Sequence, residues 1–246
     1  TASEYPSLPP DLIEPAHEER RKLLSGPRRP VAVTPSHWMA AEARRGLWSA
    51  SAVQVIPYSI PLESLQPVLC ERARSQLGFL TRGPVLLVSA FDHSDPRKGS
   101  RVLAEALRLL KPRPLTLLLM GGGRIEVHDP GIEVHHLGFI ADELRQALVY
   151  SACDLLVHPA LADNLPNVIL EAFACGLPVV GFALGGIIDL IQPGRTGWLA
   201  SPASAPALAD GIERALEDLA NGCNLRTNCR AFAVQNFAPE RQAASV

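Results

Sequence analysis

Short apolar runs alternate with amphipathic segments between residues 85 and 182. Most of the runs contain no charge, which is typical of strands that are buried on both faces of a sheet. Helices between such strands favour parallel pairing, because a parallel crossover needs about a dozen residues or more. We therefore expect an α/β fold with a doubly wound, parallel, Rossmann-like sheet, with strands at residues 85–90, 115–120, 132–137, 155–157 and 179–182 and helices at 100–110, 142–151 and 168–174.

The two ends of the chain have weaker patterns. Pro15 suits the first position of a short helix, Ser36 would cap a second one, and Gly78 would end a third. Residues 62–68 have the composition of a linker. The remaining predicted elements are an extended lead-in at 1–14, helices at 17–24, 37–47, 72–77, 205–221, 224–234 and near Pro239, and strands at 31–33 and 53–56.

The stretch from His158 to Val180 carries the clearest candidate site. A polar loop at 162–167 follows a predicted strand, and the helix after it is apolar except for Glu171. A carboxylate among such neighbours needs a partner, because burying it unpaired costs several kcal/mol. The start of a helix also favours a phosphate, since its amide groups and its dipole attract anions.

This stretch resembles the donor-binding signature of retaining GT-B glycosyltransferases of the family 4 type, which use nucleotide sugars. In that signature two acids with seven residues between them precede Ala-x-Ala-x-Gly-x-Pro-Val-Val, and here Asp163 and Glu171 precede the same residues at 172–180. The first acid is usually Glu in the family, so the shorter Asp163 is a departure. The resemblance implies that the sheet is the C-terminal domain of a GT-B fold.

The resemblance also implies roles for the residues of this stretch. Glu171 would accept hydrogen bonds from the ribose hydroxyls, and Asp163 would contact the transferred sugar. Main-chain amides would be offered by Asn164, Leu165 and Asn167. From the residues alone a second interpretation stays open, in which Asp163 caps the helix and Glu171 pairs with a core arginine.

The loop after the first strand of the sheet contains a candidate cation. Lys98-Gly99 resembles the diphosphate-binding Lys-Gly of the family, and the positive charge of Lys98 could stabilise a departing diphosphate. The family often has an arginine six residues earlier, where this chain has Asp92, so Arg97 or a residue elsewhere would supply the second cation. We therefore assign Lys98 and Asp163 to catalysis and Arg97 to donor binding.

Glycines follow three further strands. Gly121, in the run Met120 to Gly123, would let a ligand approach the backbone, although a tight turn explains it equally well. Gly138 and Phe139 match the family segment that lies against the nucleobase. The pair at 185–186 resembles the Gly-Gly of the family, and a plain turn is an equal explanation.

Composition excludes several classes of protein. The 246 residues carry a net charge of −2, which argues against nucleic acid as a partner. No apolar run is long enough to span a membrane. The five cysteines form no C-x-x-C pair, which favours reduced thiols in the cytoplasm and no metal site. His135, His136 and His158 have no metal-ligand spacing, and we interpret His158 as structural.

The resemblance predicts the organisation of the chain. Residues 1–60 would be a remnant of the N-terminal acceptor domain with its linker, 61–235 the donor-binding domain and 236–246 the start of a crossover helix. The first residue is Thr1, which suggests a processed or truncated chain.

The expected function is sugar transfer from a nucleoside-diphosphate sugar to a saccharide or lipid-linked acceptor, with retention of configuration. The sugar nucleotide is the donor substrate, and no separate cofactor is expected. The missing N-terminal domain could associate with a membrane surface. The alternatives are a sugar-nucleotide epimerase with a GT-B fold and a non-catalytic nucleotide-binding or assembly module.

Overall fold

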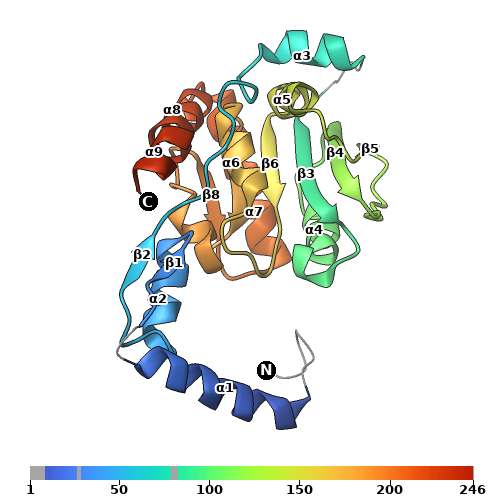
Figure 1. Ribbon diagram of the computed structural model, residues 1–246. Coiled ribbons are helices and arrows are strands. Elements are labelled where there is room, and N and C mark those ends of the chain that lie inside the picture. Colours follow the sequence, from blue (N-terminus) through green and yellow to red (C-terminus); the bar gives the residue numbers. More distant parts are fainter. Residues whose placement is uncertain (1–8, 27–28, 79–82, 246) are drawn as a thin grey trace. The chain divides into compact units, whose positions relative to one another are not determined.

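Six parallel strands form the sheet of the larger of two compact units, which spans Pro57–Val246 (Figure 1). The computed structural model describes residues 9–26, 29–78 and 83–245. The strands are β3 (Val85–Asp92), β4 (Leu115–Gly122), β5 (Ile132–Gly138), β6 (Leu155–His158), β7 (Val179–Phe182) and β8 (Gly197–Ala200). The predicted parallel sheet is confirmed, and β8 is a strand that the sequence pattern did not predict.

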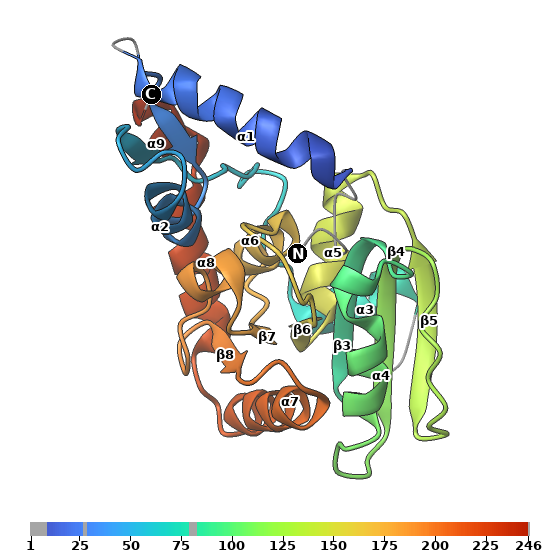
Figure 2. The same ribbon diagram turned by 90° about the horizontal axis from the view of Figure 1, so that it is seen from below.

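Helices cover both faces of this sheet, so the predicted double winding is confirmed. One hydrophobic core includes Tyr150 and Phe173, and the other, across the sheet, includes Leu103 and Ile212. Figure 2 shows α5 (Glu143–Ala152) and α6 (Asn167–Ala174) on one side of the sheet and α7 (Ala205–Ala220) on the other. The first core is built by α5, α6 and α8 (Leu225–Phe237), and the second by α4 (Ser100–Leu107) and α7.

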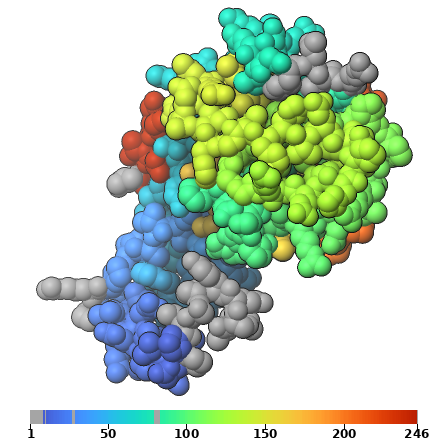
Figure 3. Space-filling model, turned by 90° about the vertical axis from the view of Figure 1, so that its right-hand side faces the viewer, coloured from blue at the N-terminus to red at the C-terminus, as the bar shows by residue number. Residues whose placement is uncertain are grey.

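The order of the strands reverses between β3 and β6. The sheet reads β5-β4-β3-β6-β7-β8, so the chain builds outward from β3 to one edge and then returns to β6 to build the other side. The segment around the edge strand β5, in yellow-green, forms much of the surface of this unit that faces the viewer in Figure 3. Ligands of doubly wound sheets bind outside the carboxyl ends of the strands at such a reversal. The loops after β3 and β6 therefore lie where a site is expected.

The predicted linker at 62–68 is packed onto this unit. Leu65 is buried, and Arg230 of α8 donates from Nη1 to the carbonyl oxygens of Leu65 and Ala174, both at 2.8 Å. The bond to Ala174 satisfies a carbonyl at the C-terminal end of α6, which would otherwise lack a partner. This arginine thereby fixes the helix that carries the conspicuous carboxylate at position 171. Two shorter helices complete the unit, α3 (Cys70–Leu77) and α9 (Pro239–Ala244).

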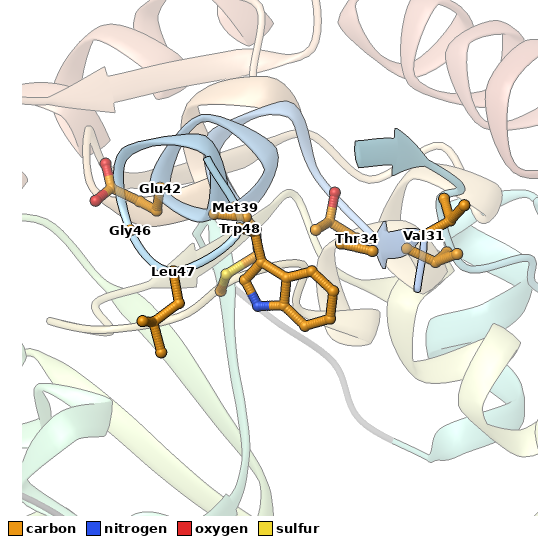
Figure 4. A pocket seen from close by; sticks show the side chains of 10 residues that line it. Val31, Thr34, Met39, Glu42, Gly46, Leu47 and Trp48 are labelled. Carbon is orange, nitrogen blue, oxygen red and sulfur yellow. The ribbon is translucent and has the colours of Figure 1, made fainter. Parts of the chain in front are cut away.

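The smaller unit, Thr1–Ile56, contains the predicted strand-helix-strand step. Strands β1 (Ala32–Thr34) and β2 (Val53–Val55) pair in parallel, and Ser36 caps the intervening helix by accepting the Met39 backbone N–H at 3.0 Å. A hollow of about 590 Å³ lies beside β1 and this helix, and Figure 4 shows the side chains of Leu47 and Trp48 among those that line it. The described helices of this unit are α1 (Pro10–Ser25) and α2 (His37–Arg45).

Helix α1 begins at Pro10 rather than at residue 17. The predicted lead-in is therefore wrong for residues 10–14, while residues 1–8 lie outside the described part of the chain. Pro10 occupies the first turn, where a missing N–H costs nothing. Pro15 lies inside the helix, where it removes the backbone donor for the Asp11 carbonyl, and water can satisfy that group because Asp11 is exposed.

Candidate functional site

Lys98 ends a short 3₁₀ helix, η1 (Pro96–Lys98), in the loop after β3. Gly99 follows with a φ of 71°, a left-handed conformation that favours glycine. A side chain there would also collide, because an added Cβ would lie 1.9 Å from the Pro159 carbonyl oxygen. The Leu161 N–H donates to the Arg97 carbonyl at 2.8 Å. The loops after β3 and β6 are therefore in direct backbone contact, as the reversal of strand order predicts.

These two loops bring together a lysine, a carboxylate and a histidine. Lys98 Nζ donates to Asp163 Oδ2 at 3.0 Å, and the side chains are 28% and 19% exposed. His158 Nε2 lies 3.4 Å from the same oxygen, while the Asn164 N–H donates to Oδ1 at 3.0 Å. Burial by itself raises the pKa of Asp163, but His158 and Lys98 outweigh burial and lower that pKa to about 2. Asp163 is therefore an ionised carboxylate with contacts on both oxygens.

Two glycines fix the backbone of Asp163. Gly185 and Gly186 open a 3₁₀ helix, η2 (Gly185–Asp189). An added Cβ would lie 2.0 Å from the Asp163 carbonyl oxygen at the first position and 1.9 Å from the Asn164 carbonyl oxygen at the second. The Gly186 N–H also donates to the Asp163 carbonyl at 3.3 Å. The close approach of two backbones explains this glycine pair.

Glu171 lies on α6, where its carboxylate meets a tyrosine. Tyr150 of α5 is fully buried and donates its hydroxyl to Glu171 Oε2 at 2.6 Å. Burial raises the pKa of Glu171, and the Tyr150 hydrogen bond offsets part of that effect. Within the described ranges no lysine or arginine forms an ion pair with this carboxylate, and no side chain caps α6. The interpretation in which Asp163 caps this helix and Glu171 pairs with a core arginine is therefore wrong.

Arg97, the candidate second cation, pairs with a carboxylate of its own loop. Its Nη2 lies 2.6 Å from Asp95 Oδ2, and its side chain is 53% exposed. Asp92 shapes the same loop, because its Oδ1 accepts both the N–H and the hydroxyl of Ser94, at 2.8 Å and 2.7 Å. A ligand would have to draw the guanidinium from Asp95 to use its charge.

The loops after β4 and β5 place the other predicted residues. Gly121 has a φ of 116°, and an added Cβ would lie 1.7 Å from the Ala90 carbonyl oxygen, so close packing of β3 and β4 explains this glycine. Gly138 has a φ of 66° with open space around it. Phe139 is 63% exposed and contacts Phe91, which is 82% exposed, with 5.1 Å between ring centroids. The two rings form an exposed aromatic pair at the carboxyl edge of the sheet.

Of the three predicted main-chain donors, Asn164 already donates its N–H to Asp163 Oδ1, so the structure does not offer this amide to a ligand. The other two lie just before α6 and at its first residue. Leu165 is buried in the core, which anchors the loop, and Asn167 is the exposed first residue of the helix. Pro166 between them provides no N–H. No side chain caps the first turn of α6, and the Ile169 N–H donates to the Pro166 carbonyl at 3.0 Å, so the N–H groups of Asn167 and Val168 are the ones that an anion would meet.

Sequence reasoning missed three residues of this region. Tyr150 lies in the buried second half of α5, and its only signal is one hydroxyl among residues that resemble core. Phe91 is the last residue but one of β3, and an exposed aromatic residue has no signature in a single sequence. His158 was interpreted as structural, although an imidazole that ends an apolar strand beside an acidic loop is a signal of contact with a carboxylate.

The model of the family described as glycosyl transferases group 1 matches residues 83–218, which is more than half of the chain. The chain belongs to this family of glycosyltransferases. A D-inositol 3-phosphate glycosyltransferase of Arthrobacter sp. (strain FB24) is 30% identical over 242 residues, covering 91% of this chain and 55% of the relative. This glycosyltransferase chain thus spans about half the length of the curated relatives it matches.

Solved structures agree on the fold. A sucrose-phosphate synthase of Thermosynechococcus elongatus superimposes with a TM-score of 0.78 at 29% identity, over 94% of this glycosyltransferase chain and 59% of that one. Anabaena Alr3699/HepE, solved in complex with UDP-glucose, has a TM-score of 0.69 at 23% identity, over 94% of this chain and 68% of that one. The predicted GT-B fold is therefore confirmed.

No helix in the described ranges combines the length and the apolar character needed to cross a membrane. No three histidine, cysteine, aspartate or glutamate side chains in the same ranges lie close enough together to hold a metal ion.

Proposed function

We propose that this chain is the donor-binding part of a glycosyltransferase that moves a sugar from a nucleoside-diphosphate sugar to an acceptor, with retention of configuration. One observation carries the proposal. The Lys98–Asp163 pair and the start of α6, which no side chain caps, both lie at the carboxyl ends of the strands where the strand order reverses. Glu171, on the same helix, adds a buried carboxylate without a cation. The UDP-glucose complex of Anabaena Alr3699/HepE supports a sugar nucleotide as the ligand.

Glu171 is suited to hold the ribose. Its Oε2 is fixed by the Tyr150 hydroxyl, which leaves Oε1 to accept a hydrogen bond from a ribose hydroxyl. A carboxylate that is already oriented by a neighbour loses little entropy when it binds a ligand. Tyr150 is therefore a positioning residue in this proposal. The nucleobase would lie toward Gly138 and Phe139, whose ring contacts the ring of Phe91.

The diphosphate would lie between Lys98 and the first turn of α6. Its negative charge would draw the ammonium group away from Asp163, and the amide groups near Asn167 would donate to phosphate oxygens. These donors would stabilise the charge that develops on the departing diphosphate. Arg97 would add a second positive charge once released from Asp95, and Gly121 would leave room beside β4. The proposal includes no metal and no cofactor besides the donor substrate.

Asp163 would orient the transferred sugar. Its carboxylate is ionised and its backbone is fixed by the Gly185–Gly186 contact, so the loop with Asn164 and Leu165 can present it at a defined position. Since Asp is one methylene shorter than Glu, the loop must approach the sugar closely or reach it through water. We propose a positioning role for Asp163 and no covalent step.

The rest of the enzyme is also part of the proposal. Residues 1–60 would belong to the acceptor-binding domain, 61–235 to the donor domain and 236–246 to a helix that crosses back. The boundary between compact units lies four residues earlier, between Ile56 and Pro57. The acceptor would be a saccharide or a lipid-linked acceptor. We propose a cytoplasmic enzyme whose acceptor domain could associate with a membrane surface, with no role for nucleic acid.

Isothermal calorimetry of the chain with UDP, GDP, ADP and CDP tests the donor site. One of these nucleotides should bind, and the matching nucleoside alone should bind more weakly because it lacks the diphosphate. The longer protein should then transfer sugar from the matching sugar nucleotide. Binding without transfer in the longer protein would favour a non-catalytic module, and a chain that binds none of the four would remove the proposal.

A further inference from the structure

His158 is almost fully buried, and its Nε2 makes no well-formed hydrogen bond. It ends β6 after three apolar residues, its side chain is 4% exposed, and its Nε2 has no hydrogen-bond partner among the described residues. The charged atom beside it is Asp163 Oδ2, at 3.4 Å. The imidazole therefore faces the carboxylate of the proposed sugar site, at a distance slightly too long for a good hydrogen bond.

A strand end of this kind does not need a histidine. β6 is paired on both sides, with β3 and β7, and an apolar residue at its end would continue the core without leaving a polar atom unpaired. In the ligand-free form His158 attracts Asp163 only across 3.4 Å and makes no well-formed hydrogen bond from Nε2, so the buried imidazole leaves part of its hydrogen-bonding capacity unused. The imidazole would gain a full hydrogen bond if the side chains around it had a second arrangement when a ligand is bound.

The contacts of Asp163 define that second arrangement. In the free protein Lys98 occupies Oδ2 at 3.0 Å and the Asn164 N–H occupies Oδ1 at 3.0 Å, so the carboxylate has its donors without His158. The lysine side chain is 28% exposed and flexible, and a diphosphate attracts it more strongly than a single carboxylate does. When Lys98 turns to the diphosphate, Oδ2 loses its donor.

We propose that His158 is a positioning residue for the donor sugar, which takes over Asp163 Oδ2 when a diphosphate draws Lys98 away. This inference rests on the proposed function and adds a residue to it. A movement of about half an ångström brings the two atoms to the ordinary distance of a charge-assisted hydrogen bond. A neutral imidazole with its proton on Nε2 is a sufficient donor. His158 thereby keeps the carboxylate fixed while its free lone pairs accept hydroxyls of the sugar.

Two substitutions separate this role from a purely structural one. His158→Leu removes the donor and fills the apolar strand end, while His158→Gln keeps a neutral N–H donor of similar reach. His93→Leu is a matched control, because His93 is also buried but uses its Nε2, which lies 3.2 Å from the Met120 carbonyl oxygen. Two quantities are measured for each variant. One is the midpoint of thermal unfolding of the free chain, and the other is the pair of dissociation constants for a diphosphate and its sugar nucleotide, UDP and UDP-glucose or GDP and GDP-mannose.

The replacement of Lys98 by His158 as the donor to Asp163 predicts a specific pattern of stabilities and affinities. In the free chain His158→Leu should lower the unfolding midpoint less than His93→Leu does, because Lys98 and the Asn164 N–H still hold Asp163. Affinity for the bare diphosphate should stay within about twofold, but affinity for the sugar nucleotide should fall by about five- to tenfold in His158→Leu. His158→Gln should recover most of that loss.

Other results would overturn the proposal. If His158→Leu keeps the ratio of the two dissociation constants within twofold, the imidazole does not position Asp163 for the sugar. If His158→Leu lowers the unfolding midpoint as much as His93→Leu does and His158→Gln recovers no affinity, the histidine is structural. If the unmodified chain binds none of UDP, GDP, ADP and CDP, the proposed function itself fails. That result differs from a chain that binds a nucleotide without using His158.

Discussion

Replacement of Glu171 by Gln separates the binding role of this carboxylate from its effect on stability. The substitution keeps the size of the side chain and the acceptor for the Tyr150 hydroxyl, which lies 2.6 Å from Oε2. It removes the negative charge that would strengthen a hydrogen bond from a ribose hydroxyl. The fold should survive, since α6 is held by its apolar residues and by Arg230.

The magnitude follows from the charge that is lost. A hydrogen bond to a charged group contributes about 1.5–3 kcal/mol, and about 1.4 kcal/mol corresponds to tenfold in affinity. Gln keeps one neutral acceptor, so the nucleoside diphosphate should bind about tenfold more weakly. Glu171→Ala removes both acceptors and should weaken binding further. Calorimetric titration of the three proteins with the same nucleotide measures these losses.

Stability should change in the opposite direction. Burial raises the pKa of Glu171 above its ordinary value of 4.5, so the protonated acid favours the fold below that pH. This contribution is lost as the pH rises through the raised pKa, and the ionised carboxylate opposes folding near neutrality. Glu171→Gln should therefore keep or raise the unfolding midpoint at pH 7 and flatten its dependence on pH above 4.5. A lower midpoint with unchanged nucleotide affinity would refute the reasoning, because Glu171 would then be a structural residue.

Three further predictions concern the cluster beside it. Lys98→Ala should weaken a nucleoside diphosphate far more than the bare nucleoside, as titrations with both would show, and added salt should reproduce part of the loss; equal losses would mean a structural role. Asp163→Asn should lower affinity for the sugar nucleotide more than affinity for the diphosphate. The pKa of Asp163, about 2, lies below its ordinary value, so the ionised carboxylate stabilises the fold above pH 3.8. Acid titration should show this contribution lost as the pH falls toward 2. Gly186→Ala should displace the Asp163 loop and weaken the sugar nucleotide, whereas Gly194→Ala, at a φ of 74° with open space around it, should cost about 1–2 kcal/mol of stability and leave binding unchanged.

Burial on both faces made the central strands predictable. β3, β4, β6 and β7 are continuous apolar runs, and no other environment suits such runs in a chain of this composition. β8 escaped prediction because it is a four-residue edge strand with a partly exposed Trp198, so it has neither an apolar run nor a clear alternation. The start of α1 escaped because Pro10 suits an extended lead-in and Pro15 suits a first helical position, so the helix was predicted to begin after Pro15.

The site was predictable where a motif names it and unpredictable where contacts define it. Lys98 and Asp163 were found in separate loops, but they are 65 residues apart, and only the reversal of strand order brings them to 3.0 Å. Tyr150 and His158 were missed because each places one polar atom at the end of a residue that otherwise packs as core. A single sequence does not reveal where such an atom points.

A crystal structure of the chain with the nucleoside diphosphate that calorimetry selects is the most direct test of the account. The diphosphate should lie between Lys98 Nζ and the first turn of α6, the ribose hydroxyls should lie within about 2.6–3.2 Å of Glu171, and Lys98 should have left Asp163. A nucleotide bound elsewhere on the sheet, with the Lys98–Asp163 pair still at 3.0 Å, would contradict the account.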